Sequence, residues 1–254
     1  MRDSRTAPTV IFFDLDDTLL DDRAASSAGL RALMERVGHP SFTAARHLWD
    51  VQTDISFGAY ITGRLSFQEQ RRERVRALTT QAGNSQISDA ECDELYQVYL
   101  QAHRASWHTF DDVAPALSRI ATLGIGLGVI TNGVETLQRE KLTALGIINQ
   151  FHDIVCADAV GVGKPDARVF EIACQRLGVA PHQCWHVGDQ MRADALGAVA
   201  AGLRPILVNR YGQHTGPNNE APSDITAIEK LDDLVDLAGG GGPTAVPKAE
   251  TELQ

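Results

Sequence analysis

Four short groups of polar residues in this chain carry side chains that could bind a phosphate group together with a divalent cation. Carboxylates that are crowded at one site repel each other, and a divalent cation is the usual remedy. Hydroxyl, amide and lysine groups suit an anion such as phosphate. In chain order, the four groups are Asp14-Leu15-Asp16-Asp17-Thr18, Thr131-Asn132-Gly133, Gly163-Lys164-Pro165-Asp166, and Gly188-Asp189 with Asp194 five residues later.

An isolated Asp-x-Asp pair is more often a solvated junction between a strand and a loop than a binding site. Asp14 and Asp16 can approach one ligand only if the chain leaves strand geometry between them. The other groups change this balance, because each lies where a predicted strand or loop meets a helix. In open α/β folds, ligands bind at the carboxyl ends of the strands. Together the four groups predict one site for phosphate and metal.

The elements that must position these groups alternate between strand and helix along the second half of the chain. An apolar run at residues 10–13 predicts a central parallel strand that is buried on both faces. Further strands are predicted at 125–130, 154–156, 184–187 and 205–208, and helices at 112–123, 134–145, 166–177 and 191–201. This alternation predicts an α/β fold, a Rossmann-like doubly wound parallel sheet with helices on both faces.

Residues 21–106 have a helical pattern instead and predict an inserted α-helical cap domain. Ser66 with Glu69, and Ser88 with Glu91, have the spacing of capping boxes at helix N-termini. After the second box, an amphipathic face is predicted at Leu95, Val98, Tyr99 and Ala102. The predicted domains are therefore a discontinuous core at 1–20 and 107–238, the cap at 21–106, and a flexible tail at 239–254 that begins with four glycines.

Composition excludes several classes of protein. The chain has 254 residues, of which 43% are hydrophobic, and a formal net charge of −10. The apolar content argues against disorder, and the negative charge makes nucleic acid a poor partner. No apolar run is long enough for a membrane span, and residues 1–8 lack the apolar stretch of a signal peptide. Four separated cysteines predict buried thiols in a reducing compartment, so we expect a cytoplasmic protein, with a monomer as the expected state.

The four polar groups, in this order and at these distances, resemble the motifs of the haloacid dehalogenase (HAD) superfamily. The resemblance is to its phosphatase subgroup with a helical cap inserted after the first strand. The superfamily motifs D-x-D-x-T, Thr or Ser, Lys, and G-D-x-x-x-x-D match, in turn, residues 14–18, Thr131, Lys164, and the group of Gly188, Asp189 and Asp194. The resemblance covers roughly residues 9–238.

The resemblance implies a role for each residue in the reaction. Asp14 is the expected nucleophile, which forms an aspartyl-phosphate, and Asp16 is the expected general acid and base. Lys164 is expected to offset charge in the transition state. With Thr131 and Asn132, the latter through its backbone, it is also expected to bind the phosphoryl oxygens of the substrate.

The metal implied by the resemblance is Mg²⁺, a hard cation that prefers oxygen ligands. Its expected protein ligands are the Asp14 carboxylate, the Asp16 backbone carbonyl and the Asp189 carboxylate. Asp194 and Thr18 are expected to support these groups without touching the ion, Asp194 by orienting the lysine or the waters around the metal.

The expected reaction is Mg²⁺-dependent hydrolysis of a small phosphorylated metabolite, with a phosphomutase of the same superfamily as the alternative. Asp16 argues against dehalogenation, because dehalogenases lack the second Asp, and a cap without lysine argues against a phosphonate hydrolase. A phospho-accepting signalling domain, the non-enzyme alternative, has its acceptor at the third strand and no cap. The substrate itself stays open among sugar phosphates, nucleoside monophosphates, phosphoglycolate and acylneuraminate phosphates.

Two further features are predicted to be structural. A basic run on a cap helix, interleaved with Glu69 and Glu73, consists of Arg71, Arg72, Arg74 and Arg76. The interleaved acids predict a solvated helix face rather than a nucleic-acid patch. His186, on the strand before Gly188, is predicted to be a packed core histidine.

Overall fold

The computed structural model describes residues 7–212 and 225–239. The chain divides into two compact units. One, called the α/β unit, comprises Met1–Asp21 with His108–Gln254, and the other, called the helical unit, comprises Asp22–Trp107. No helix within the described ranges is both long and apolar enough to cross a membrane.

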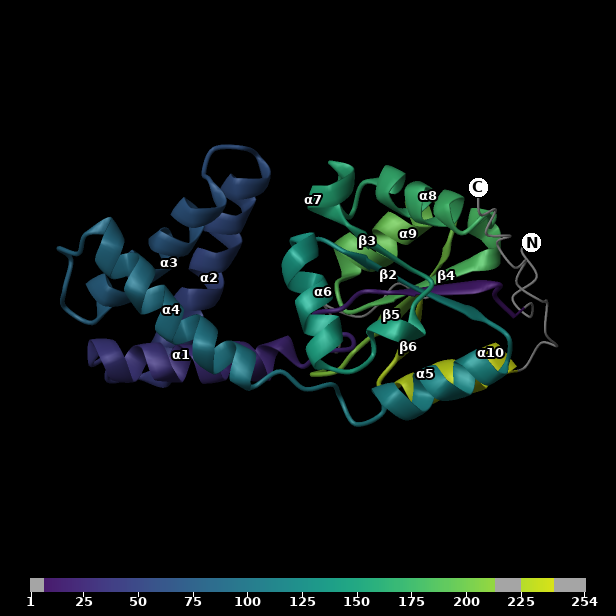
Figure 1. The fold of residues 1–254 in the computed structure, drawn as a ribbon, viewed down its shortest axis with the longest axis horizontal. Coiled ribbons are helices and arrows are strands. Elements are labelled where there is room, and N and C mark those ends of the chain that lie inside the picture. Colours follow the sequence, from purple (N-terminus) through teal and green to yellow (C-terminus); the bar gives the residue numbers. More distant parts are fainter. Residues whose placement is uncertain (1–6, 213–224, 240–254) are drawn as a thin grey trace, which may run out of the picture. The chain divides into compact units, whose positions relative to one another are not determined.

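The α/β unit is built on six parallel strands in the order β3-β2-β1-β4-β5-β6 (Figure 1). Their bounds are β1 Val10–Phe13, β2 Gly126–Thr131, β3 Asp153–Cys156, β4 Cys184–Gly188, β5 Arg204–Val208 and β6 Thr226–Ile228. The position of β1 between β2 and β4, with every residue buried, confirms the predicted central strand. The sequence did not predict β6, whose three residues are too few to show a period.

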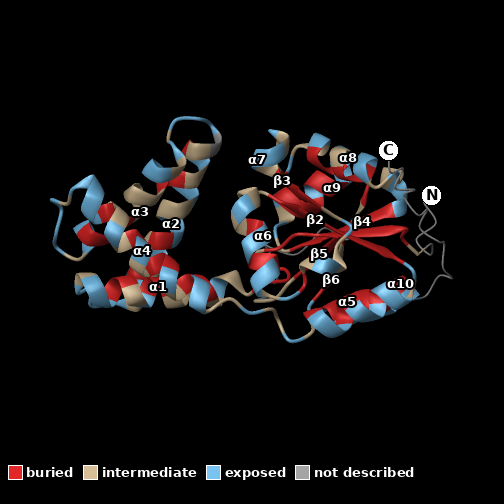
Figure 2. Cartoon of the chain, viewed as in Figure 1, coloured by how far each residue is buried: buried red, intermediate tan, exposed pale blue. Residues whose placement is uncertain are grey.

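Helices cover both faces of the sheet, which confirms the predicted Rossmann-like fold. Helices α5 (Val113–Thr122) and α10 (Leu231–Gly239) pack together on one face, and α8 (Ala167–Arg176) and α9 (Gly197–Ala200) lie on the other (Figure 1). The remaining helices are α6 Glu135–Ala144 and α7 Ala157–Val160, with 3₁₀ turns η1 Ile148–Gln150 and η2 Pro181–Gln183. Figure 2 shows the strands buried along most of their length, whereas the helices alternate between buried and exposed residues.

The helix expected at 191–201 consists of two segments. The first is a π-helical segment, η3 (Met191–Leu196), and α9 follows it. Both Asp194 and Ala195 donate their backbone N–H to the Gln190 carbonyl, so the wider turn directs Asp194 into the interior, where it is 1% exposed. A Cβ at Gly188 would collide with the Asp194 carboxyl group. The glycine of the fourth motif therefore makes room for the aspartate.

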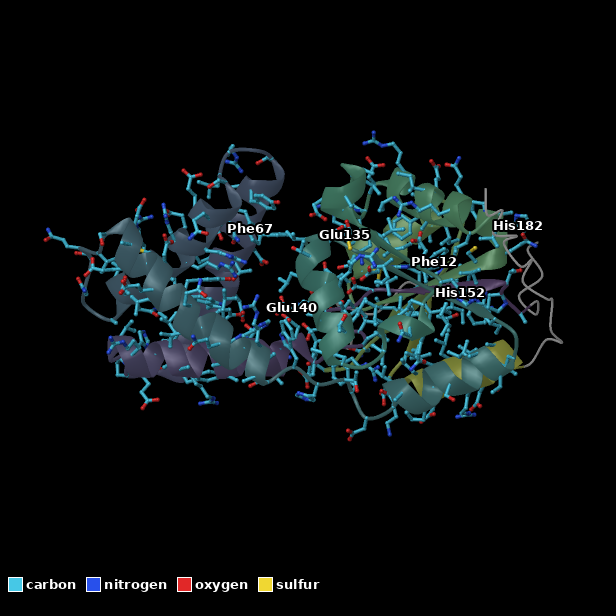
Figure 3. All side chains as sticks on the ribbon, in the orientation of Figure 1. Phe12, Phe67, Glu135, Glu140, His152 and His182 are labelled. Atoms are coloured by element: carbon cyan, nitrogen blue, oxygen red, sulfur yellow. The ribbon has the colours of Figure 1, made fainter. Side chains whose placement is uncertain are left out.

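Another glycine lies in the middle of the sheet and allows close packing between strands. A Cβ at Gly128 of β2 would lie 2.6 Å from Cδ1 of Phe12, the fully buried β1 residue labelled in Figure 3. Close approach of a neighbour is the usual reason for a glycine inside a strand. All four cysteines are buried free thiols, as predicted. The predicted flexible tail lies outside the described residues, except for Gly239, which ends α10.

The helical unit contains α1 Asp22–Val37, α2 Phe42–Ile61, α3 Phe67–Gln81 and α4 Asp89–Ala105. Both predicted capping boxes are present, at Ser66 and Ser88. The predicted apolar face of α4 is only partly right, because Tyr99 is buried, whereas Leu95, Val98 and Ala102 are half-buried. The buried residues of this helix are Cys92, Tyr96, Tyr99, Leu100 and His103. The face is rotated because Tyr96 and Tyr99 pack on Trp49, with ring centroids 6.5 and 4.8 Å away.

Candidate active site

Three of the polar groups found in the sequence follow neighbouring strands. Asp14 follows β1, Thr131 ends β2, and Asp189 follows β4. Parallel strands end at the same edge of a sheet, so the fold gathers these residues. The strand order also reverses here, because β2 lies on one side of β1 and β4 on the other. Such a reversal is where doubly wound sheets bind ligands.

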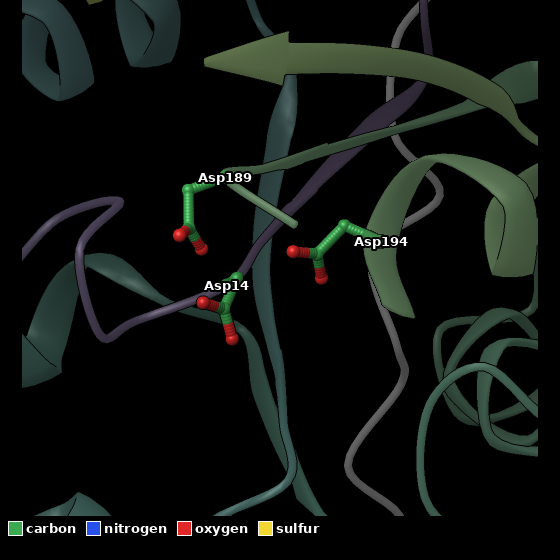
Figure 4. A group of neighbouring side chains, drawn as sticks. All are labelled: Asp14, Asp189 and Asp194. Atoms are coloured by element: carbon green, nitrogen blue, oxygen red, sulfur yellow. The ribbon is translucent and has the colours of Figure 1, made fainter. Parts of the chain in front are cut away.

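Three carboxylates meet at this edge of the sheet. Asp14, Asp189 and Asp194 each offer an oxygen within 4.8 Å of the other two (Figure 4). Burial, together with the charges of the neighbouring carboxylates, raises the pKa of Asp14 to about 7 and the pKa of Asp189 to about 9. The ionised forms of these two side chains therefore need positive charge close by.

Lys164 supplies one positive charge. Its Nζ lies 2.6 Å from Asp14 Oδ1 and 2.6 Å from Asp194 Oδ1, and the residue is only 7% exposed. Burial opposes the charge on the amine, but the two carboxylates raise the pKa of Lys164 above its ordinary value. The loop that precedes α8 thus places a fixed cation between the first and fourth motifs.

Asp194 lies behind this lysine and is itself held by two donors. Its carboxylate accepts hydrogen bonds from Nε2 of His186 at 3.0 Å and from the Gln190 backbone N–H at 2.9 Å. Despite its burial, Lys164 and His186 lower the pKa of Asp194. His186 is 1% exposed and packs edge-on against Phe170, which confirms a core histidine. Its bond to Asp194, which the sequence did not indicate, links the core to the lysine.

Asp16 is held by helix α6, a contact that we did not predict. Lys141 Nζ lies 2.6 Å from Asp16 Oδ1, and Gln138 Nε2 donates to Asp16 Oδ2 at 3.1 Å. Gln138 and Lys141 are 1% and 4% exposed, which is unusual for such polar side chains. Their i, i+3 spacing on the helix after Thr131 was the available signal. It was hidden because most neighbouring residues of this helix are polar too.

Thr131 is oriented by its own surroundings. Its Oγ1 accepts hydrogen bonds from Gln138 Nε2 at 2.7 Å and from the Gly133 backbone N–H at 3.2 Å. A hydroxyl has two acceptor positions and one donor proton, so its O–H is left to donate. The arrangement suits an anionic oxygen as the acceptor. A Cβ at Gly133 would collide with Gln138, so this glycine makes room for the amide that orients the hydroxyl.

The Asn132 side chain bonds to the loop that carries Lys164, whereas the predicted phosphate contact concerns only the backbone of this residue. Its Nδ2 donates to the Lys164 carbonyl at 2.9 Å, and its Oδ1 accepts from the Lys164 N–H at 2.7 Å. The amide is therefore committed to fixing the lysine backbone. Only the Asn132 backbone is left for a phosphoryl oxygen.

Thr18 belongs to a braced loop rather than to the carboxylate cluster. It is fully buried, and its carbonyl accepts a hydrogen bond from Arg210 at 2.9 Å. The next residue after that arginine, Tyr211, donates its O–H to Asp21 at 2.5 Å and to Asp17 at 3.3 Å. The segment after β5 thus holds the loop after β1, in which Asp17 has a left-handed φ of 60°. We did not predict either bracing residue.

The fold is a Rossmann-like parallel sheet, and three carboxylates gather beside the ends of its central strands. Residues 8–202 match the model of the haloacid dehalogenase-like hydrolases. The chain belongs to this family, as its motifs indicated.

Known relatives give the enzyme class. The chain is 30% identical over 239 residues to a phosphoserine phosphatase of Thermus thermophilus, which covers 85% of this chain and 94% of the relative. It is 26% identical to a glyceraldehyde 3-phosphate phosphatase of Methanothermobacter thermautotrophicus, with 89% and 98% covered. A 2-haloacid dehalogenase structure from Pseudomonas syringae is 28% identical with a TM-score of 0.64, and the match covers 91% of this chain and 98% of that one. The predicted enzyme class, a HAD-type phosphatase, is confirmed.

Proposed function

We propose that this protein hydrolyses phosphate monoesters of small metabolites, with Asp14 as the nucleophile and an aspartyl-phosphate as the intermediate. The observation that supports this most directly is the buried Asp14 carboxylate, at the end of the central strand, 2.6 Å from Lys164 Nζ. A carboxylate attacks only when ionised, and the lysine favours that form in spite of burial. Relatives named for phosphoserine and glyceraldehyde 3-phosphate support a small phosphorylated substrate.

In the proposed first step, an oxygen of Asp14 bonds to phosphorus while the ester P–O bond breaks. Asp16 gives a proton to the leaving oxygen, and Lys141 and Gln138 fix its side chain for this transfer. Asp16 then takes a proton from the water that attacks the aspartyl-phosphate, which releases inorganic phosphate and restores Asp14. Throughout, the Thr131 hydroxyl donates to a phosphoryl oxygen and Lys164 offsets its negative charge.

The donors at this site fit Mg²⁺. Asp14 and Asp189 present carboxylate oxygens to one point, and because burial and the neighbouring carboxylates raise the pKa of both, a cation there would favour their ionised forms. These two carboxylates and the Asp16 backbone carbonyl are the proposed ligands, whereas Asp194 already bonds to Lys164 and His186. When bound, the ion would neutralise charge on the phosphoryl group being transferred.

The fold alone does not choose between a phosphatase and a dehalogenase, because both occur on it. The leaving group distinguishes the two reactions. A departing halide is stable without a proton, so a general acid near the nucleophile has no use in dehalogenation. A departing alkoxide needs a proton, and Asp16, which is two residues from the nucleophile and bonded to two side chains of α6, is available to supply it.

A phosphate-release assay tests this proposal. We expect Mg²⁺-dependent release from p-nitrophenyl phosphate and from several small phosphate esters, and no release in the presence of a chelator. The panel should include sugar phosphates, phosphoglycolate, phosphoserine and nucleoside monophosphates. If none of them releases phosphate with Mg²⁺ present, the hydrolase proposal is wrong, and the phosphomutase alternative should be tested by following phosphoryl transfer between sugar positions.

A further inference from the structure

The four arginines of helix α3 do not form one solvated face, as the sequence suggested, but two different faces. Arg72 bonds to Asp93 and Asp89 at 2.6 Å each, and Arg76 bonds to Asp89 and Glu73. Acids therefore neutralise these two arginines, but they are mainly Asp89 and Asp93 of α4 and not the interleaved acids of the prediction. Among the described residues, the other two arginines have no such partners.

Arg71 and Arg74 lie on the opposite stripe of α3 and pack against aromatic rings. The Arg71 Cζ lies 4.1 Å from the ring centroid of Phe67, the residue labelled in Figure 3, and 5.0 Å from that of Tyr96. The Arg74 Cζ lies 5.3 Å from the Tyr96 centroid and 5.5 Å from that of Trp49. Both arginines are half-buried, and Trp49 and Tyr96 are 2% and 6% exposed. The rings hold the guanidinium planes in place.

Within the described part of the chain, neither of these arginines forms an ion pair. Their Nε atoms are buried and donate no hydrogen bond to any described residue. The Arg74 Nη2 reaches only neutral oxygens, Gln70 Oε1 at 2.6 Å and Tyr96 Oη at 3.1 Å. Burial is the main cause that lowers the pKa of Arg71; the like charges of Arg74 and Arg104 add to it, and Tyr96 opposes it. Two adjacent cations held this way repel each other, and an anion between them would remove the repulsion.

We propose that Arg71 and Arg74 form an anion-binding site on the helical unit, which takes a carboxylate or phosphate group. Two guanidinium groups that are already oriented by rings lose little freedom when they bind such a group, and their forked N–H donors match its oxygens. Free anions and the far end of a phosphorylated substrate share this chemistry. The substrate source rests on the proposed function, whereas anion binding itself does not.

The test measures malonate binding by calorimetry. Malonate is a dicarboxylate without phosphate, so it does not depend on hydrolysis. We expect Arg71→Met and Arg74→Met each to weaken its binding on the order of ten- to a hundredfold. The matched controls Arg72→Met and Arg76→Met remove a charge from the same helix and should leave its affinity within about twofold. Methionine retains an unbranched apolar stem over the rings, and melting temperatures would show that all four variants fold.

A second arm identifies the source of the anion with two esters that differ in one group. Phosphoglycolate carries a carboxylate where ethyl phosphate carries a methyl group. A preference for phosphoglycolate in kcat/KM that is lost in Arg71→Met and Arg74→Met would assign the site to substrate. An unchanged preference, with malonate binding lost, would assign it to a free anion. Equal malonate affinity in all five proteins, or no malonate binding by the wild type, would overturn the site. Failure to hydrolyse p-nitrophenyl phosphate would count against the proposed function alone.

Discussion

In the α/β unit, buried charges alternate in sign: Asp14, Lys164 and Asp194 form a chain with both links at 2.6 Å. In the helical unit, Arg71 and Arg74 are adjacent and of like sign, with aromatic rings around them. In the first case the three charges are paired with one another, whereas the two arginines form no ion pair with any described residue.

This difference separates charges that are arranged for a reaction from charges that are arranged for binding. A group that must react needs a fixed position and a defined protonation state before the substrate arrives, and internal partners provide both. A group that only binds is more effective if its donors are held but unused. Burial is the main cause of the raised pKa values of Asp14 and Asp189 and of the lowered pKa of Arg71, and like charges nearby add to it.

The largest expected effect comes from removing the first charge of the alternating chain. Asp14→Asn preserves shape but removes the nucleophilic oxygen charge, so turnover should be abolished and no phosphorylated enzyme should accumulate. Asp16→Asn should lose about 10²- to 10⁴-fold, as is typical when general acid–base catalysis is removed. Phosphate release and intact-protein mass spectrometry after rapid acid quench measure both. Wild-type turnover in Asp14→Asn would disprove the assignment of the nucleophile.

The second prediction separates two carboxylates of the same cluster. Asp194→Ala removes one of the two carboxylates that pair with buried Lys164. Because Asp14 remains, the loss of unfolding free energy should be at or below the lower end of the about 3–5 kcal/mol that breaking a buried ion pair costs. Asp189→Ala removes a carboxylate that lies among other carboxylates, so it should change stability little and instead abolish most Mg²⁺ binding.

Chemical denaturation and Mg²⁺ calorimetry on both variants make this measurement. Equal Mg²⁺ affinity in wild type and Asp189→Ala would contradict the proposed metal ligand. Full stability in Asp194→Ala would show that the chain of alternating charges does not hold the site together.

The sequence predicted the α/β unit well because its chemistry and its fold constrain the same residues. Asp14, Thr131 and Asp189 must each follow a strand, so apolar runs that end in polar groups indicated both the strands and the site. The partners that hold these residues were not visible. The sequence patterns that predict α6 and β4 do not depend on Gln138, Lys141 and His186. Only the packing of these two elements brings the three side chains to Asp16 and Asp194.

The helical unit was predicted less well, because the rotation of a helix about its own axis decides which of its faces is buried. The pattern at Leu95, Val98, Tyr99 and Ala102 is a valid amphipathic stripe, yet the buried stripe is centred on Tyr96 and Tyr99. The basic run of α3 was likewise treated as one surface. Residues three or four positions apart share a helix face and consecutive residues do not, so Arg71 and Arg72 lie on different faces of α3. Which face is buried depends on Trp49, from another helix.

The third prediction concerns the helix that holds Asp16. In Lys141→Met, Asp16 loses a side chain that fixes the position of its carboxyl group, so its proton transfer to the leaving group should be less effective. An alkoxide depends on that proton far more than p-nitrophenolate does. We therefore expect kcat on alkyl phosphates to fall about tenfold or more, with a much smaller change on p-nitrophenyl phosphate. Arg139→Met is the matched control, because Arg139 lies on the same helix and pairs with exposed Glu135. An equal loss on both substrates would assign Lys141 a purely structural role.

The smallest expected effect compares helix capping with a surface ion pair as sources of stability in the helical unit. Ser66 Oγ accepts the Glu69 N–H at 3.1 Å, and the Glu69 carboxylate accepts the Ser66 N–H at 2.6 Å, which closes the N-terminus of α3. Ser66→Ala removes one half of this box and should cost about 1 kcal/mol of unfolding free energy. Asp50→Ala breaks the exposed Arg46–Asp50 ion pair and should cost only about 0.3–0.5 kcal/mol, the usual value for such pairs on helices.

Hydrogen exchange locates the effect of the capping variant. Amides at the start of α3 should exchange faster in Ser66→Ala, whereas those of β1 and β4 should exchange at the wild-type rate. If Asp50→Ala were the more damaging change, surface charge rather than capping would stabilise these helices, and the contrast between the two units would have to be drawn differently.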